Sequence, residues 1–265
     1  MIAFLGRKVL NFLADLGDVF IFLFYIFRTL FTTRGNLKTI SGQVSAITIR
    51  SLSTIIFAGI FVGAILVIQF NLILEKYDAQ IYLGGLNTSA VVRSIGPLII
   101  SFLLAGKVGA YTAAELGTMR VTEQIDAIEC LGTNPIQYLI VPRFFGIIIS
   151  SLILLAIGLV VSILGGMVVA STVCGINYLQ FASSIPRFTS ASTVVAGMFK
   201  CLIYGSIVAS VSCHRGFTAS GGARGVGKAV TWAAVYTHFY IVFANYLSGD
   251  LLDLFMTFVE GVPQN

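Results

Sequence analysis

Long stretches without charge constrain most strongly what this chain can fold into. No Asp, Glu, Lys or Arg occurs between Phe144 and Pro186, and none occurs between Ser51 and Leu74. A transmembrane helix needs about 20 consecutive apolar residues to cross a hydrocarbon layer about 30 Å thick. The apolar residues follow one another without the period-2 alternation that marks the strands of a membrane β-barrel. The sequence therefore predicts an all-α integral membrane protein.

Composition agrees with a membrane location. Hydrophobic residues make up 57% of the chain and charged residues 10%, with a mean hydropathy of +0.95. Soluble domains carry about 25% charged residues, so this chain has too little polar surface to cover itself in water. We expect a single domain over residues 1–265 with no soluble catalytic module. The net charge of +5 fits basic residues held on the cytoplasmic side of a membrane, and no nucleic-acid partner is expected.

Hydropathy divides the chain into five expected transmembrane helices, at residues 51–74, 94–114, 144–173, 193–212 and 229–249. Gly175 and Asn177 are expected to turn the chain into a loop after the third of these. Before the five spans, the apolar run Val19–Phe27 is too short to span the hydrocarbon layer. Acidic residues precede this run and no small-residue cleavage site follows it, which argues against a signal peptide. We therefore expect an interfacial amphipathic helix and a connector within residues 1–38.

The distribution of basic residues predicts the orientation in the membrane. With the N-terminus in the cytoplasm, the cytoplasmic segments hold all Lys and Arg residues except Lys76, Arg93, Arg187 and Lys200. Cytoplasmic loops of membrane proteins carry an excess of such residues. We therefore expect a cytoplasmic N-terminus and, after five spans, a C-terminus on the outer side.

Features that suggest catalytic or metal sites are weak in this sequence. Residues 222–228 spell GxxxxGK, but Ala229 stands where a phosphate-binding loop needs Ser or Thr. We interpret residues 213–228 as a flexible, Gly-rich cytoplasmic loop. The four cysteines lack metal-ligand spacing, and neither His214 nor His238 has a second ligand at such spacing. We expect no active site, no metal and no cofactor bound by this chain.

The polar segment at residues 115–143 is the most informative part of the sequence. Within it, Glu123, Asp126 and Glu129 recur at i, i+3 and i+6 and so line one face of a short helix. Apolar residues line another face: Ile125, Ile128 and Leu131. A short, acidic, amphipathic helix outside the membrane is suited to dock in a groove of a partner protein. A solvated connecting loop is the alternative interpretation.

A specific motif overlaps this polar segment. From Ala105 the chain reads AGKVGAYTAAELGTMRVTEQIDAIE, and it continues to Asn134-Pro135 and Val141-Pro142-Arg143. This stretch resembles the signature of the MlaE-family permeases, the membrane subunits of Mla/Mce-type ABC transporters that move phospholipids or other apolar molecules across the cell envelope. Weaker matches extend over nearly the whole chain. The family's architecture, an interfacial helix and five spans, is the one that hydropathy predicts here.

The resemblance implies that residues 115–131 form a cytoplasmic coupling helix on a separate ABC ATPase, which hydrolyses ATP. The implied contacts are Glu115, Gly117, Thr118, Glu123, Gln124 and Asp126. It also implies a homodimer in a bacterial inner membrane, with a lipid cavity between the first, second and fifth spans of the two copies. An MCE-domain periplasmic subunit and a small STAS-type cytoplasmic subunit are further implied partners. The GxxxG pair of Gly59 and Gly63 would allow close helix approach there.

Three residues are expected along the substrate path: Gln69, Arg93 and Lys200. Lys200 lies near the middle of a span, where a charge is costly, and it faces either the cavity or a partner helix. Arg93 either meets a lipid phosphate or anchors its helix at the interface. Lys107 lies closer to a span end and can snorkel. The chain departs from the family pattern where acidic residues are replaced, at Ser94, Asn245 and Arg224, so the family's charge-paired headgroup site does not carry over directly.

Two other classes of membrane protein are the alternatives. A secondary transporter would ordinarily show internal repeats and buried carboxylates. A membrane-embedded lipid-modifying enzyme would need a cluster of His, Asp or Glu near one membrane face. The sequence shows neither pattern. The leading interpretation is therefore a non-catalytic permease subunit of an ABC lipid transporter.

Overall fold

The structure is a bundle of long helices. The computed structural model describes residues 17–19, 21–26, 28–29 and 37–260, and these residues contain no strand. The α-helices are α2 (Leu37–Leu74), α3 (Leu83–Ala90), α4 (Gly96–Leu104), α5 (Ala110–Val121), α6 (Gln124–Cys130), α7 (Val141–Thr172), α8 (Tyr178–Phe188), α9 (Ala191–Phe217) and α10 (Gly222–Glu260). Short 3-10 turns, η1 (Glu75–Tyr77) and η2 (Gln80–Tyr82), and π-helical turns, η3 (Val91–Ile95), η4 (Ala105–Gly109) and η5 (Ile136–Ile140), lie between them.

Four continuous helical segments in the described part of the chain are long and apolar enough to cross a membrane. They cover Leu37–Tyr77, Gln80–Val121, Ile136–Thr172 and Ala191–Phe217. Each segment contains all, or all but the last residue, of one of the first four expected spans. Each also extends beyond the expected span at one end or both. The reason is that charged and polar residues beside the apolar core continue the helix rather than end it. The prediction of an all-helical membrane protein is confirmed.

Helix α10 contains the fifth expected span, residues 229–249. At 39 residues it is long enough to cross a membrane, but it is not among the four sufficiently apolar segments. Polar side chains interrupt its apolar sequence at Thr231, His238 and Asn245. The fifth span therefore stays a prediction.

The expected interfacial helix falls mostly outside the described residues. What is described is a short apolar helix over Gly17–Ile26. Its Phe22 and Ile26 side chains are buried, and the Phe22 ring lies edge-on to the ring of His214, with centroids 5.3 Å apart. This segment therefore packs on the C-terminal end of α9. The interfacial location stays a prediction.

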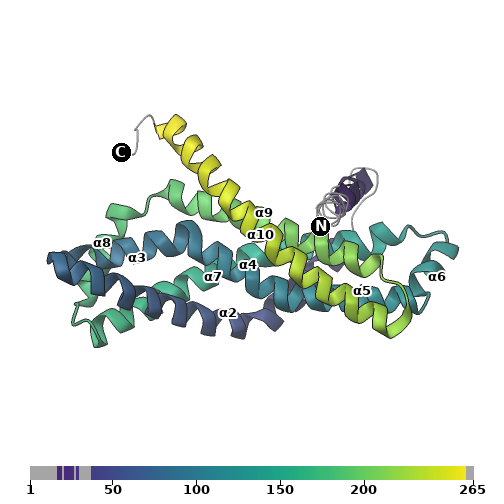
Figure 1. Ribbon diagram of the computed structural model, residues 1–265, viewed down its shortest axis with the longest axis horizontal. Coiled ribbons are helices and arrows are strands. Elements are labelled where there is room, and N and C mark those ends of the chain that lie inside the picture. The colour runs from purple at the N-terminus through teal and green to yellow at the C-terminus, as the bar shows by residue number, and fades with distance from the viewer. Residues whose placement is uncertain (1–16, 20, 27, 30–36, 261–265) are drawn as a thin grey trace, which may run out of the picture.

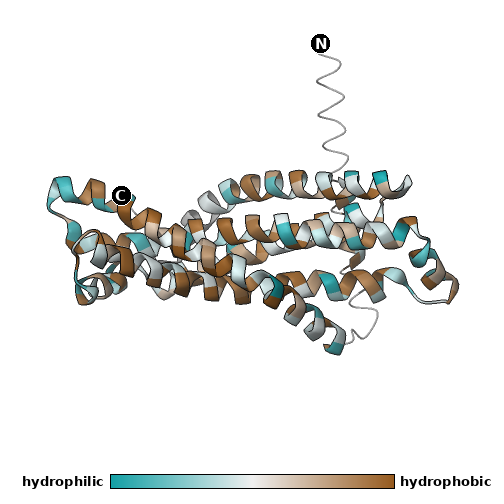
Figure 2. Cartoon of the chain, turned by 90° about the horizontal axis from the view of Figure 1, so that it is seen from below, coloured by the Kyte–Doolittle hydropathy of each residue, from teal (hydrophilic) through white to brown (hydrophobic). Residues whose placement is uncertain are grey.

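The helices run roughly along one axis, with different elements at the two ends (Figure 1). Helix α8 and the turns before α3 lie at one end, and α6 lies at the other, while the last part of α10 diverges from the bundle. Hydrophobic residues dominate the middle of the long helices, and hydrophilic residues gather at both ends (Figure 2). This distribution is expected of a bundle whose middle lies in hydrocarbon and whose ends meet headgroups and water.

Helices α2 and α7 pack closely through small residues. A Cβ atom added at Gly63 would lie 1.9 Å from the carbonyl oxygen of Ser162, and one added at Gly59 would lie 3.1 Å from the carbonyl oxygen of Gly158. Only glycine allows backbones to approach this closely. The GxxxG pair therefore contacts α7 of the same chain, whereas the sequence pattern suggested a contact at the cavity between two copies.

Two segments expected to be loops are largely helical. In the Gly-rich segment 213–228, α9 continues to Phe217 and α10 begins at Gly222, so only residues 218–221 connect them. Positive φ angles at Gly221 and Gly222, of 88° and 65°, supply the tight turn. After Gly175 the chain forms α8, which begins where the Asn177 side chain accepts a hydrogen bond from the Leu179 N–H.

Candidate functional site

The polar segment 115–143 is a broken helix at one end of the bundle. Helix α5 ends at Val121, and the chain turns at Glu123, whose φ of 60° is in the left-handed region that non-glycine residues rarely adopt. Helix α6 then follows from Gln124. An ion pair between Arg120 and Asp126 joins the two helices across the turn. The predicted short helix is thus present, and its position relative to α5 is fixed by a specific contact.

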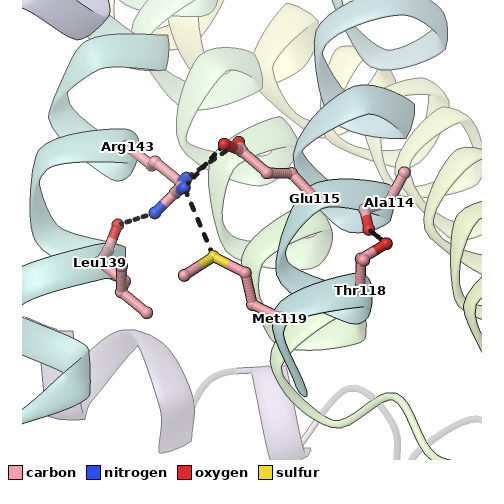
Figure 3. A network of polar contacts seen from close by, with 6 residues as sticks. All are labelled: Ala114, Glu115, Thr118, Met119, Leu139 and Arg143. Carbon is pink, nitrogen blue, oxygen red and sulfur yellow. Dashed lines mark hydrogen bonds and ion pairs between the residues drawn. The ribbon is translucent and has the colours of Figure 1, made fainter. Parts of the chain in front are cut away.

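A buried arginine ties this segment to the start of α7. Arg143 is 8% exposed, and its Nη2 lies 3.1 Å from Oε1 of Glu115 on α5. Its Nε donates to Oε2 of the same carboxylate, and its Nη1 donates to the Leu139 carbonyl at 3.0 Å. The Met119 sulfur also lies beside the guanidinium group (Figure 3). Both oxygens of the Glu115 carboxylate therefore face the Arg143 guanidinium group, which is the geometry of a strong ion pair.

The six predicted coupling residues divide into two groups. Thr118, Glu123 and Gln124 are exposed, and Asp126 is half-exposed beside Arg120. Glu115 points toward Arg143 within the chain (Figure 3). Gly117 is buried, and a Cβ atom added there would contact side chains of Ala219 and Val226. The exposed group can meet another protein, while the inward pair connects α5 to α7 and to the α9–α10 connection.

The inner face of α6 is apolar, as its sequence predicts. Ile125 is fully buried, and Ile128 packs against the main hydrophobic core. Leu131, expected on the same face, lies after the end of α6 and is 82% exposed. Helix α6 ends at Cys130, just before Gly132 with its positive φ of 76°, which places Leu131 beyond the last turn of the helix. The acidic face of α6 consequently points away from the bundle.

The predicted substrate-path residues lie on three different elements. Arg93 is part of the π-helical turn η3, Lys200 is buried on α9 at 4% exposure, and Gln69 is exposed near the end of α2. Helix α9 crosses η3 very closely, since a Cβ atom added at Gly197 would lie 2.3 Å from the carbonyl oxygen of Val92. Lys200 is about one turn beyond Gly197. The fold therefore brings the turns that carry Arg93 and Lys200 together.

Sequence reasoning missed a polar contact between α9 and α10. The Tyr204 hydroxyl donates to Oδ1 of Asn245 at 2.9 Å and lies 3.1 Å from the Ser248 hydroxyl. Asn245 stands where the family pattern has an acidic residue, and here its amide oxygen serves as the acceptor. The signal in the sequence was the spacing of Tyr204 one helical turn after Lys200, which places both on one side of α9.

A large apolar cavity lies beside this contact and was also missed. It has a volume of about 520 Å³ and lies between α9, α10 and the short helix over Gly17–Ile26. Its lining is almost entirely apolar and includes Leu202, Ile203, Ile207, Tyr240, Phe243 and Leu247. Pockets for small ligands commonly have volumes of about 300–1,000 Å³. Such a cavity depends on how the helices cross, which hydropathy does not reveal.

Comparison with known proteins assigns the family. The family model described as "Permease MlaE" matches residues 40–249. The chain belongs to the MlaE permease family. A probable ABC transporter permease protein of Rickettsia typhi is 32% identical to this MlaE-family chain, over 93% of the chain and 95% of the relative. A second, from Synechocystis sp., is 35% identical over 86% of each.

A plant relative extends the comparison. The Arabidopsis thaliana protein TRIGALACTOSYLDIACYLGLYCEROL 1, chloroplastic, is 33% identical over 75% of the MlaE-family chain and 57% of its own length. The MlaE family and the permease relatives make this chain a transport subunit of the membrane rather than a catalytic enzyme. Among the residues described, no three His, Cys, Asp or Glu side chains gather as a metal site would require.

Proposed function

We propose that this chain is the membrane subunit of an ABC transporter that moves phospholipid, or a similar apolar molecule, across or between bacterial envelope membranes. The observation that carries the proposal is the broken α5–α6 helix, which belongs to the segment matched by the MlaE family model. It combines an exposed acidic face with an ion pair to α7. A partner pressing on α6 would therefore move α5 and α7 together.

The partner on α6 is, in this proposal, a separate cytoplasmic ABC ATPase. This chain binds no cofactor of its own, and ATP is used by the partner. Thr118, Glu123 and Gln124 are the proposed contacts, because they are exposed. Asp126 positions α6 through Arg120, and Glu115 and Gly117 transmit the movement inward. The permease relatives, which are named as ABC transporter permeases, support the ATPase assignment.

The lipid substrate is proposed from the apolar cavity. The cavity of about 520 Å³ between α9 and α10 has the apolar lining that acyl chains need. Lys200 and Arg93 would meet the polar headgroup, and Gln69 is a further candidate on α2. The Arabidopsis relative is named after trigalactosyldiacylglycerol, a glycolipid, which agrees with a lipid substrate.

The assembly and topology complete the proposal. We place the chain in the bacterial inner membrane as a homodimer, with a cytoplasmic N-terminus, an interfacial N-terminal helix and five spans, the fifth within α10. The C-terminus would then be periplasmic. An MCE-domain periplasmic subunit and a small STAS-type cytoplasmic subunit are the further proposed partners. The length of α10 supports a fifth crossing despite its polar residues.

The test is charge reversal at Glu123. Asp126 is unsuitable because reversing it would also break its ion pair with Arg120. In the complex reconstituted with its ATPase, Glu123→Lys should leave assembly intact but lower lipid transfer per ATP hydrolysed by roughly tenfold, the effect of losing one hydrogen bond to a charged group. The matched control is Glu75→Lys, the same change on an exposed residue of η1 at the other end of the bundle.

Different outcomes separate the alternatives. Normal transfer per ATP in Glu123→Lys would refute the coupling role of α6. Lipid transfer that continues without ATP or ATPase would favour a secondary transporter. Chemical conversion of the lipid by the isolated chain would favour a lipid-modifying enzyme.

A further inference from the structure

A second, smaller cavity lies beside the Arg143–Glu115 ion pair and differs in chemistry from the apolar one. It has a volume of about 200 Å³ and is bounded by α2, by η4 with α5, and by the start of α7. Its charged lining residues are Arg50, Lys107, Glu115 and Arg143. A water molecule takes about 30 Å³ of liquid volume, so the cavity has room for a small polar group with some of its hydration.

The cavity has an excess of positive charge. Both oxygens of Glu115 face Arg143, which leaves that pair neutral. Lys107 Nζ donates to the Arg50 carbonyl at 2.6 Å and to the Thr54 hydroxyl at 3.0 Å, and neither acceptor is charged. Among the ion pairs of the described residues, none involves Lys107 or Arg50. Two positive charges therefore line the cavity without an opposing carboxylate.

The groups are held so that they can receive an anion. The Arg50 guanidinium carbon lies 5.1 Å from the ring centroid of Tyr111, a cation–π contact that uses the face of the ring and none of the hydrogen-bond donors of the guanidinium group. Lys107 has three donors and uses two of them for the α2 contacts. Arginine and lysine side chains arranged in this way suit a phosphate group.

The cavity lies at the depth of lipid headgroups. Arg50 immediately precedes the uncharged run from Ser51 to Leu74, which as a helix is about 36 Å long and so covers a hydrocarbon layer of about 30 Å. Arg50 is therefore at the edge of that layer. Tyr111 is 51% exposed beside it, and exposed tyrosines are typical of the membrane–water boundary.

We propose that this cavity binds the phosphate group of an anionic phospholipid from the leaflet next to α5 and α6. Basic cavities between transmembrane helices are suited to such headgroups. The bound lipid would contact both α2 and α5 beside the Arg143–Glu115 pair. It would thereby stabilise the position of α5, the helix that precedes α6. This site does not depend on lipid transport, since the proposed transport path lies at α9, α10 and η3, and Gln69 lies toward the opposite end of α2 from Arg50.

Thermal unfolding of the purified full-length chain in a neutral detergent tests the site. Adding short-chain phosphatidylglycerol well above its dissociation constant should raise the unfolding midpoint by roughly 5 °C. Short-chain phosphatidylcholine, which has no net charge, and inorganic phosphate at the same concentration should each give less than half of that rise. Equal rises with phosphatidylcholine would refute an anion site, and an equal rise with inorganic phosphate would refute the lipid assignment.

Substitutions test whether the stabilisation by phosphatidylglycerol arises at this cavity. Arg50→Gln preserves the hydrogen bonds of Lys107 and should at least halve the rise with phosphatidylglycerol, and Arg50→Gln with Lys107→Gln should abolish it. The readout is the difference with and without lipid, so a lower starting stability does not obscure it. Lys228→Gln, which removes an exposed positive charge on α10, is the matched control and should keep the full rise. An unchanged rise in the double variant would overturn the proposal.

Discussion

Arg143 carries its charge into the interior of the bundle with Glu115 as its counter-ion. A charged group is costly to bury unless it is paired and hydrogen-bonded, and here the guanidinium group meets a carboxylate and a carbonyl. Glu115→Ala should therefore lower the free energy of unfolding. A fully buried pair loses about 3–5 kcal/mol when one partner is removed. Because the Glu115 side chain is 38% exposed, we expect about 1–2 kcal/mol, measured by thermal or denaturant unfolding in detergent.

Two further variants separate the ion pair from a general charge effect. Glu129→Ala removes a carboxylate from an exposed position on α6, at the same end of the molecule, and should change stability by less than about 0.5 kcal/mol. Arg143→Met combined with Glu115→Gln removes both charges and should be more stable than Glu115→Ala alone. Equal losses in Glu115→Ala and Glu129→Ala would show that the pair contributes nothing.

Helices α2 and α7 make a close backbone contact at Gly63. Gly63→Ala would place its Cβ atom 1.9 Å from a backbone oxygen of α7, so the two helices must move apart. Overpacking of this kind costs about 1–3 kcal/mol. Gly42→Ala lies on the same helix with nothing within 4 Å of the new Cβ atom, and it should stabilise α2 by up to about 1 kcal/mol. Opposite shifts in the unfolding midpoint are expected, and a stabilising Gly63→Ala would contradict the packing.

Hydropathy and motif spacing predicted the long helices and the short polar helix α6, because both depend on local sequence. What they missed depends on contacts between distant segments. Helix α8 forms where a loop was expected, since Phe181 and Ser184 pack against glycines of α3. The π-helical turns that carry Arg93 and Lys107 leave no mark in the hydrophobic pattern. Likewise, the inward direction of Glu115 follows from Arg143, 28 residues later.

At the scale of the whole molecule, the two ends of the bundle have different structures. One end holds the broken helix α5–α6 with its ion pairs, and the other holds the amphipathic helix α8 packed on α3. Between α6 and α8 the chain passes through one helix that is long and apolar enough to cross a membrane, α7. We therefore expect the two ends to face opposite sides of the membrane. Each end has a native cysteine close to it: Cys130 at the end of α6 and Cys174 just after α7.

Labelling of these cysteines tests the orientation. In variants that retain only one cysteine, a membrane-impermeant maleimide added to intact spheroplasts should label Cys174, and it should label Cys130 only after permeabilisation. Partial burial and, to a smaller extent, the negative charge of Glu75 raise the pKa of the Cys174 thiol above its ordinary value of 9.0. Because the thiolate is the reactive form, labelling of Cys174 should be slow at pH 7 and accelerate as the pH rises, and Glu75→Gln should speed it. Labelling of both cysteines from one side would rule out the crossing by α7, and labelling of Cys130 alone in intact spheroplasts would reverse the orientation.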